Sequence, residues 1–179
     1  MTSTQSKKAL IREAGAGDPE RLSLVANATF LETFSGLIDG DALVVHCAKA
    51  HAPARFGDLL AAGARAWLAE IDGAPIGYAL LTEPELDAAR DGDVELKKIY
   101  LLSRFHGSGI ARQLFDAALA GAQGNTRLVL GVKDDNRRAI AFYAKQGFKQ
   151  IATRRFDVGG ILYDDVVLAR DLERTLPHE

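Results

Sequence analysis

A strand, a glycine-containing turn and a helix follow one another in the middle of this chain, and they restrict its fold more than any other feature. The apolar pattern predicts a strand at 94–102 and a helix at about 110–122. Gly107 and Gly109 lie in the turn between them. Another apolar run, at 127–132, predicts a buried strand. Because such a connection is nearly always a right-handed crossover, we expect the two strands to lie parallel in one sheet.

Other apolar runs of the chain predict further strands. Two of them, 65–71 and 74–81, are joined by Asp72 and Gly73, a pair that tolerates the positive φ angles of a tight hairpin turn. These two strands are therefore expected to form an antiparallel hairpin. Three more strands are expected at 9–14, 148–156 and 162–169.

Helices are expected between these strands, at 19–35, 110–122 and 139–146. The first has a clear start signal, because Asp18 is an N-cap acceptor and Pro19 suits the first helical position. The region 41–63 is interrupted at Pro53 and Gly57, so we expect two short helices there or one helix with a break. The order β-α-α-β-β-β-α-β-α-β-β predicts an α/β fold. Its α+β mixed sheet is expected to be antiparallel in its first half, with one parallel pair and helices on both faces.

Composition indicates what class of chain this is. Of the 179 residues, 47% are hydrophobic and 26% charged, a balance typical of a single globular domain, here residues 1–179. No stretch reaches the roughly 18 apolar residues of a membrane span, and no apolar segment follows the polar start, so we expect neither membrane insertion nor secretion. The single cysteine, Cys47, has no partner for an internal disulfide, which favours a reducing, cytoplasmic location.

Charge argues against two further classes of protein. The chain has 22 Lys and Arg against 24 Asp and Glu, a net charge of -2, so it has no overall attraction to nucleic acid. Its four histidines form no Cys/His cluster with zinc-site spacing, and we expect no metal. His46 and Cys47 are neighbours on a helix and point in different directions, which argues against a nucleophilic pair. Any anion site must therefore be local.

The turn before the central helix offers such a local anion site. Without side chains at Gly107 and Gly109, the backbone N–H groups of residues 105–110 can converge on an anion, and the start of the helix adds about half a positive charge. Arg104 and Arg112 add further positive charge. A diphosphate is the natural ligand for a turn of this kind.

Two common phosphate motifs fit this turn poorly. A Walker-type loop needs Lys and Ser or Thr after its last glycine, but Ile110, Ala111 and Arg112 follow Gly109. A dinucleotide fingerprint would have a small residue where Arg112 stands, and it usually follows the first strand of its domain. The remaining alternative is purely structural: two glycines that connect a strand to a helix.

The spacing of the turn resembles a family signature. Arg104-x-x-Gly107-x-Gly109 is similar to the Arg/Gln-x-x-Gly-x-Gly/Ala motif of the GNAT superfamily of acetyl-CoA-dependent N-acetyltransferases, and it stands at the same place, between the fourth strand and the following helix. The order of elements expected above is also the order found in that family. A second family segment is matched by Leu130, Gly131, Val132, Asn136, Ala139, Ile140, Phe142, Tyr143, Gly147 and Phe148.

The resemblance implies a GNAT fold in which the fourth and fifth strands splay apart and hold acetyl-CoA (coenzyme A) as cosubstrate, without a metal. The turn would bind the diphosphate, and backbone groups at the end of the fourth strand would pair with the pantetheine arm. Asn136 would hydrogen-bond the same arm, although a helix N-cap is its structural alternative. The cofactor-binding residues expected on these grounds are Ile99, Tyr100, Leu101, Arg104, Phe105, His106, Gly107, Ser108, Gly109, Ile110, Ala111, Asn136 and Tyr143.

Two side chains are candidates for acid-base catalysis. Tyr143 matches the family's general acid, because a phenol stays protonated at neutral pH and can donate to a departing thiolate; its alternative is a core tyrosine. Glu95 is the candidate base, early on the fourth strand, where some members of the family carry a glutamate. Without a bulge, strand alternation would put Glu95 on the face of Lys97, Ile99 and Leu101. The alternative for Glu95 is a solvated ion pair with a neighbouring lysine.

A small-molecule primary amine is the acceptor that the resemblance implies. Segments 30–34, 95–101 and 163–165 are similar to the bacterial branch that includes spermidine/spermine acetyltransferases, which suggests a polyamine or another small amine. Phe30, Glu32 and Phe34 would bind it, unless Glu32 belongs to a solvated helix face. Two other functions stay open: a non-catalytic acyl-CoA-binding or sensing domain, and a protein N-terminal or lysine acetyltransferase. A homodimer is also compatible with the family.

Overall fold

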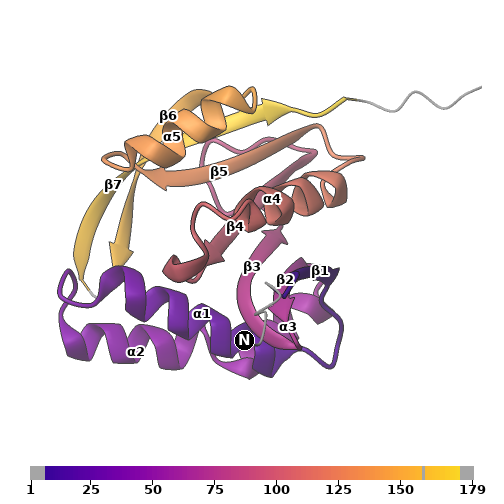
Figure 1. The fold of residues 1–179 in the computed structure, drawn as a ribbon. Helices are drawn as coiled ribbons and strands as arrows, with labels where there is room; N and C mark the ends of the chain where they lie inside the picture. The colour runs from indigo at the N-terminus through magenta and orange to yellow at the C-terminus, as the bar shows by residue number, and fades with distance from the viewer. Residues whose placement is uncertain (1–6, 159, 174–179) are drawn as a thin grey trace, which may run out of the picture.

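A seven-stranded sheet forms the centre of the computed structural model, which describes residues 7–158 and 160–173 (Figure 1). The strands are β1 (Leu10–Glu13), β2 (Arg65–Ile71), β3 (Ala74–Thr82), β4 (Asp93–Leu101), β5 (Arg127–Lys133), β6 (Lys149–Val158) and β7 (Ile161–Asp171). Their order in the sheet is β1-β2-β3-β4-β5-β7-β6. All neighbouring pairs are antiparallel except β4 and β5. The predicted mixed sheet with one parallel pair is therefore confirmed.

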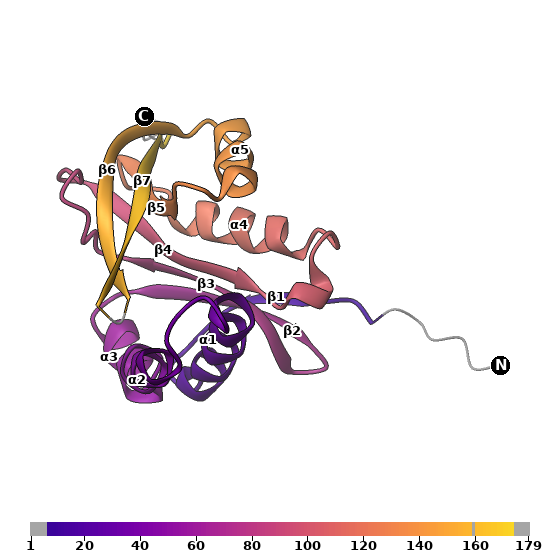
Figure 2. The same ribbon diagram turned by 90° about the vertical axis from the view of Figure 1, so that its left-hand side faces the viewer.

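Helices cover both faces of the sheet, as the sequence predicts (Figure 2). They are α1 (Pro19–Phe34), α2 (Gly40–Ala50), α3 (Pro53–Ala61), α4 (Ile110–Gly121) and α5 (Arg137–Lys145), with a short 3-10 helix, η1 (Ser103–Phe105), before α4. The helices α4 and α5 lie on one side of the sheet, and α1, α2 and α3 lie on the other. The structure is therefore an α/β fold with the layers expected.

The region 41–63 confirms one of its two expected alternatives, two short helices, and corrects the predicted order of elements. It forms two helices, α2 and α3, where the order written from the sequence counted a single helical element. Pro53 is the first residue of α3, a position where the missing N–H of proline has no partner to lose. Gly57 lies inside α3 and does not interrupt it. Three helices therefore separate the first two strands.

Alternation along β3 supplies one hydrophobic core to each face of the sheet. Tyr78 and Leu80 pack with Leu22 and other buried residues under α1 and α3. Ala79 and Leu81 point the opposite way, into a larger cluster that contains Leu114, Phe115 and Ala118 of α4. Because side chains of a strand alternate between faces, a single apolar strand fastens both helical layers to the sheet.

The two parallel strands are paired over only part of their length. Residues 93, 94 and 95 of β4 are in register with 127, 128 and 129 of β5, and no later pair follows. Beyond that point β4 continues beside β3 and β5 continues beside β7, so the strands diverge, toward the left in Figure 1. The expected splay of the central strands is confirmed, and it leaves unpaired backbone on both sides of an opening.

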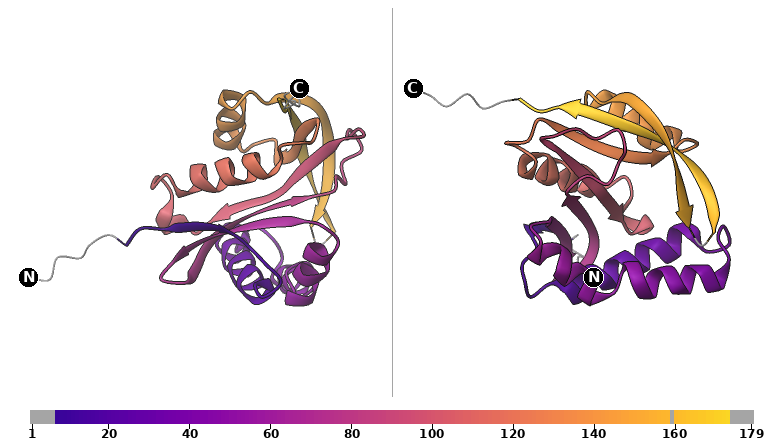
Figure 3. Two further views of the ribbon diagram at one scale, coloured as in Figure 1. Left: turned by 90° about the vertical axis from the view of Figure 1, so that its right-hand side faces the viewer. Right: turned by 180° about the vertical axis from the view of Figure 1, so that it is seen from behind.

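The hairpin of β6 and β7 bends toward α1 and α2 (Figure 3). Its Val158 is buried in a cluster with Phe30 of α1 and Leu43 of α2, and Phe156 and Tyr163 pack against the same cluster. This contact joins the end of the sheet to the helices on the face opposite α4. The opening between β4 and β5 is thereby flanked by α4 and α5 on one face of the sheet. The other face carries α1, α2 and the hairpin.

Candidate active site

The turn before α4 adopts the backbone conformation that its glycines permit. Gly107 and Gly109 have φ angles of 81° and 86°, in the left-handed region that other residues rarely adopt. Gly109 is also the N-cap of α4, and no side chain caps this helix. The first N–H groups of α4 are therefore left for an external acceptor, as expected for an anion site at a helix start.

The backbone N–H groups of the turn divide into two sets. Those of Phe105, His106 and Ser108 donate to carbonyls inside the turn, over 3.0, 3.0 and 3.2 Å. They are not free to bind a ligand, and the expectation that all amides from 105 to 110 converge on an anion was wrong for these three. The reason is that η1 closes its own i to i+3 hydrogen bonds. Ile110 N has only a long contact, 3.4 Å, with the hydroxyl of Ser108.

Four other N–H groups remain available. Within the part of the chain that the structure describes, the backbone nitrogens of Gly107, Gly109, Ala111 and Arg112 donate to no protein acceptor. They lie in the turn and the first turn of α4, so the free N–H groups extend further into the helix than the predicted range 105–110. The amide of Arg112 was not among the predicted cofactor-binding groups; its place in the first turn of a helix was the signal that pointed to it.

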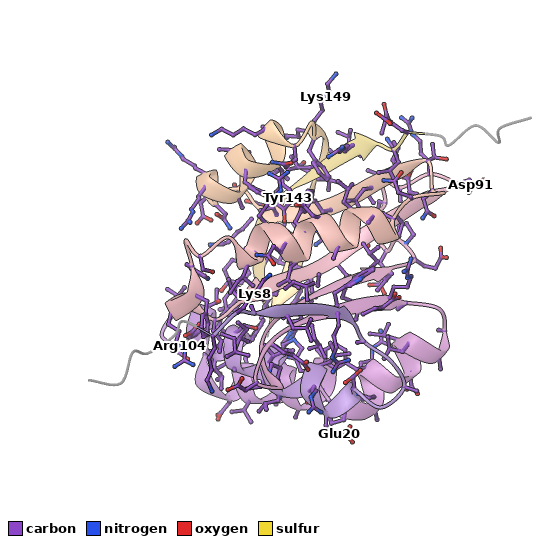
Figure 4. All side chains as sticks on the ribbon, turned by 45° about the vertical axis from the view of Figure 1, so that its right-hand side comes forward. Lys8, Glu20, Asp91, Arg104, Tyr143 and Lys149 are labelled. Atoms are coloured by element: carbon purple, nitrogen blue, oxygen red, sulfur yellow. The ribbon has the colours of Figure 1, made fainter. Side chains whose placement is uncertain are left out.

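Side chains around the turn fix its position on the sheet. His106 Nε2 lies 2.9 Å from the carbonyl oxygen of Leu101, so the imidazole N–H donates to the end of β4. Arg104 lies at the outer edge of the molecule (Figure 4), with its guanidinium 4.7 Å from the ring centroid of Phe105. Arg112 pairs with Asp116 one turn further along α4, at 2.8 Å. The positively charged side chains near the turn, Arg104 and Arg112, are therefore exposed.

Glu32 holds η1 against α1. Its two carboxylate oxygens accept from the backbone N–H and the hydroxyl of Ser103, over 2.9 and 2.8 Å. These hydrogen bonds lower the pKa of Glu32. The contact accounts for the carboxylate without a substrate, so substrate binding by Glu32 stays a prediction. Of its two predicted partners, Phe30 is buried and Phe34 is half-buried, with ring centroids 4.5 Å apart.

A bulge in β4 changes which side chains share a face. Leu80 of β3 is in register with Lys98, but the next residue, Leu81, is in register with Leu96, so Lys97 is the extra residue. Glu95 therefore shares its face with Lys98 and not with Lys97. The grouping of Glu95 with Lys97, Ile99 and Leu101, which required a strand without a bulge, is therefore not formed.

Ile99 and Leu101 pack in the core cluster under α4. The opposite face of β4, which is the face of α1 and α3, carries Glu95, Lys98 and Tyr100; the ring of Tyr100 packs near Tyr78, with centroids 6.1 Å apart. Ionisable side chains of β4 thus gather on the face away from α4. Their strand runs along the opening.

Glu95 is buried, and it is the last residue of β4 that is in register with β5. The residue is only 2% exposed, and its Oε2 accepts a hydrogen bond from the backbone N–H of Glu85 at 2.8 Å. Lys97 pairs with the carboxylate of Glu85 and not with Glu95. The solvated ion pair considered as the alternative for Glu95 is therefore absent among the described residues, and Glu95 is a buried carboxylate at the closed end of the opening.

Tyr143 approaches the opening from the other face. It lies on α5 between that helix and α4 (Figure 4), 7% exposed, with its ring 6.1 Å from Phe115. Burial raises the pKa of the Tyr143 phenol well above its usual range, and Tyr100 raises it further, so the phenol is protonated at neutral pH. No described residue accepts a hydrogen bond from its hydroxyl. The hydroxyl oxygen is nevertheless not one of the fully buried atoms that lack a hydrogen-bond partner, so it reaches solvent.

Asn136 is the N-cap of α5. Its Oδ1 accepts from the N–H of Ala139 at 3.2 Å, which is the structural alternative considered for this residue. The amide nitrogen of the same side chain is not used in that contact, and the residue is exposed. A cap and a ligand contact are therefore compatible in one side chain.

Two cationic side chains on the face away from α4 were missed by sequence reasoning. Lys98 is half-buried on β4, and Arg154 reaches from β6 to the unpaired part of β5, where Gly131 leaves room for it. Neither carries a motif; the bulge and the fold of the hairpin bring them together. No group of three His, Cys, Asp or Glu side chains suited to a metal occurs in the described ranges, and none of the described helices is long and apolar enough to cross a membrane.

Comparison with known proteins decides the family. The model of the acetyltransferase (GNAT) family matches residues 38–148. The chain belongs to this family. It is an α/β acetyltransferase, which agrees with the fold and the enzyme class expected from the sequence. The matched residues include β4, the turn that contains Gly107 and Gly109, and Tyr143.

Relatives and solved structures of this family cover nearly the whole chain. An uncharacterised N-acetyltransferase of Mycobacterium bovis is 38% identical over 158 residues, 87% of this chain and 98% of that protein. The PaiA N-acetyltransferase of Thermoplasma acidophilum, solved in complex with coenzyme A, has a TM-score of 0.72 at 19% identity, covering 92% of this chain and 99% of that one. A GNAT acetyltransferase of Streptococcus pneumoniae has a TM-score of 0.70 at 24% identity, with coverage of 92% and 100%. The latter two likenesses show the fold.

Proposed function

We propose that this GNAT acetyltransferase transfers the acetyl group of acetyl-CoA directly to a small primary amine. The observation that carries the proposal is the alignment of two features. Four free backbone N–H groups lie at the start of α4, and β4, which leads into that turn, borders the opening with its strand edge unpaired. A long donor with a diphosphate at one end and a thioester at the other fits such an arrangement.

The chain has groups suited to holding the donor. The N–H groups of Gly107, Gly109, Ala111 and Arg112 would donate to the diphosphate, helped by the positive end of α4. The edge of β4 that faces the opening would pair with the pantetheine arm, and the free amide nitrogen of Asn136 would add a contact from α5. Bound acetyl-CoA supplies an activated acetyl group as a thioester.

The amine must lose a proton before it can attack. An alkylamine with a pKa of about 10.4 is protonated at pH 7, and making it neutral costs about 4 to 5 kcal/mol. Glu95 is the proposed acceptor of that proton, directly or through a water, because it is a buried carboxylate on the face where the amine would enter.

Bond changes in this transfer balance without a further reactant. The nitrogen lone pair forms a bond to the acetyl carbon, and the carbon–sulfur bond breaks with its electron pair going to sulfur. The ammonium loses two protons in becoming an amide. The first goes to Glu95 before the attack, and the second passes through water to the Tyr143 oxygen, which has given its own proton to the sulfur. The hydroxyl is suited to this because it is protonated, unpartnered in the described structure and solvent-reaching.

Thiol release from acetyl-CoA tests the proposal. Purified protein is mixed with acetyl-CoA and a panel of polyamines, amino acids, aminoglycosides and peptides with free N-termini, and free thiol is followed with time. We expect amine-dependent release with at least one class and at least a hundredfold lower kcat in Glu95→Gln. Glu85→Gln is the matched control, because Glu85 contacts Glu95 only through its backbone. No release with any amine would contradict the proposal.

A further inference from the structure

Lys98 has an ammonium group without a partner. Among residues 7–158 and 160–173, no carboxylate pairs with it and no oxygen accepts a hydrogen bond from it. Its neighbour on the bulge, Lys97, does have a partner in Glu85. An unpaired ammonium with a buried stem loses hydration without compensation, so it favours an anion from outside the protein.

The ammonium of Lys98 is accessible to such an anion. Two side-chain atoms of the described residues are fully buried without a hydrogen-bond partner, His46 Nε2 and Thr82 Oγ1. Nζ of Lys98 is not one of them. The Lys98 side chain is half-buried and is not fully enclosed. Lys98 is in register with Leu80 of β3, which places its side chain on the face where α1 and α3 lie.

Arg154 supplies spare donors on the same face. Its Nε donates to Asp165 of β7 at 3.1 Å, while its two terminal nitrogens donate to no acceptor in the described structure. A Cβ at Gly131 would lie 2.6 Å from Nη2, so the guanidinium rests directly against β5. Gly131 is two residues past Val129, the last residue of β5 that is paired with β4. Arg154 therefore borders the opening.

The two cations act on each other. Burial, together with the charges of Lys97 and Arg154, lowers the pKa of Lys98 to about 8, against opposing effects of Glu95 and Asp165. Asp165 is already engaged by Arg154, and Glu95 by the backbone of Glu85. An incoming anion would be the first group to neutralise Lys98 at hydrogen-bond distance. It would also keep that lysine protonated.

We propose that Lys98 and Arg154 bind the carboxylate of the acceptor, so that the substrate class is a small amine that also carries a carboxylate, as in an amino acid. This inference rests on the proposed acetyl transfer, because it places the acceptor on the face of β4 that holds Glu95. Lys98 is the next residue after Glu95 on that face, since the bulge takes up Lys97. A polyamine would instead bring additional positive charge toward two cations and is disfavoured.

Matched acceptors test the carboxylate directly. Amino acids and their carboxamides are compared as acceptors with acetyl-CoA and the full chain, at equal concentrations of neutral amine. We expect kcat/KM to be at least tenfold higher for the carboxylate form. Equal rates for both forms, or higher rates for polyamines, would overturn this inference and leave the proposed acetyl transfer intact.

A pair of lysine variants assigns the effect. Lys98→Met should lower the ratio of kcat/KM for the carboxylate acceptor to kcat/KM for its carboxamide at least tenfold. Lys97→Met is the matched control, since Lys97 is adjacent but paired with Glu85, and should leave the preference unchanged. Arg154→Gln should weaken the same preference. A loss of preference in Lys97→Met but not in Lys98→Met would contradict the assignment.

A binding experiment keeps the inference testable without turnover. Calorimetry measures Kd for an N-acetyl amino acid, the product form, and for its N-methylamide, in the unaltered protein and in Lys98→Met. We expect the carboxylate to bind at least tenfold tighter in the unaltered protein and the difference to disappear in the variant. Equal affinities in the unaltered protein would overturn the carboxylate site. Carboxylate-selective binding without any thiol release would retain the site and refute acetyl transfer.

Discussion

The carboxylate of Asp93 and the guanidinium of Arg127 fasten β4 to β5 by hydrogen bonds of 2.9 and 2.7 Å, two residues before the strands separate. Both side chains are buried, and the two residues are in register across the parallel pair. The ion pair closes the narrow end of the opening. It therefore fixes the point from which the two strands diverge.

Removing one member of this pair should be costly. Asp93→Asn leaves the Arg127 guanidinium buried without a counterion, and we expect a loss of about 3 to 5 kcal/mol in the free energy of unfolding. Denaturation by urea measures it. Asp116→Asn is the control, because it removes an exposed pair with Arg112 and should cost less than about 1 kcal/mol. Equal losses in both variants would contradict the role given to the buried pair.

Removal of the Tyr143 hydroxyl should separate turnover from binding. Tyr143→Phe keeps the ring in its cluster but cannot protonate the leaving sulfur, so kcat should fall about a hundredfold or more while Kd for coenzyme A changes less than threefold. Steady-state kinetics and calorimetry measure the two quantities. Tyr78→Phe is the control, since Tyr78 lies in the cluster under α1 and α3. An equal loss of kcat and affinity in Tyr143→Phe would refute the acid assignment.

A side chain at the N-cap of α4 should disturb the anion site. Gly109 has a φ of 86°, which is strained for any other residue by about 1 to 2 kcal/mol, although nothing lies within 4 Å of an added Cβ. Gly109→Ala should therefore raise Kd for coenzyme A about tenfold. Affinity for pantetheine, which lacks the diphosphate, should stay the same. Gly124→Ala, at another positive φ beyond the end of α4, is the control for general strain.

Stability should fall in mild acid because of His51. Burial, together with the charges of Lys98 and His46, lowers the pKa of His51 to about 4; its other neighbours, Asn27 and Phe30, are uncharged. In the unfolded chain the His51 imidazole has its usual pKa of about 6.5. As the pH falls, it therefore binds a proton in the unfolded state before it does so in the folded state. The free energy of unfolding should drop by about 2 kcal/mol from pH 7.5 to pH 5 through this residue.

Urea unfolding at both pH values checks this dependence. His51→Gln should show a smaller drop between pH 7.5 and pH 5 than the unaltered protein. His106→Gln is the comparison, because His106 is exposed in the anion turn. If His51→Gln kept the full dependence on pH, the drop would have another origin.

Sequence patterns predicted the parts of the fold that depend on local periodicity and on chain connection. The hairpin at Asp72 and Gly73 and the crossover from β4 through α4 to β5 both follow from such rules, and both are present. The region between α1 and β2 left two alternatives open, because a proline inside an Ala-rich segment marks either a break or a helix start; the structure has two short helices there, one more than the predicted order counted. Only packing under α1 decides between these two outcomes.

Details of the site depended on contacts that leave no local pattern. The bulge at Lys97 inserts one residue without a glycine or any other signal, and it moves Lys98 to the face of Glu95. Similarly, η1 consumes the N–H groups of Phe105 and His106, which a count of glycines does not reveal. Arg154 reaches β5 from β6 across β7, at Gly131, where no side chain stands in its way.

An NMR titration of the ¹⁵N-labelled protein with coenzyme A tests the central claim most directly. We predict that the amide signals of Gly107, Gly109, Ala111 and Arg112 shift most among those of the turn and α4, together with signals of β4 residues that border the opening. Phe105, His106 and Ser108, whose N–H groups are already bonded, should shift less. Shifts confined to other parts of the chain, or none at saturating coenzyme A, would contradict the claim.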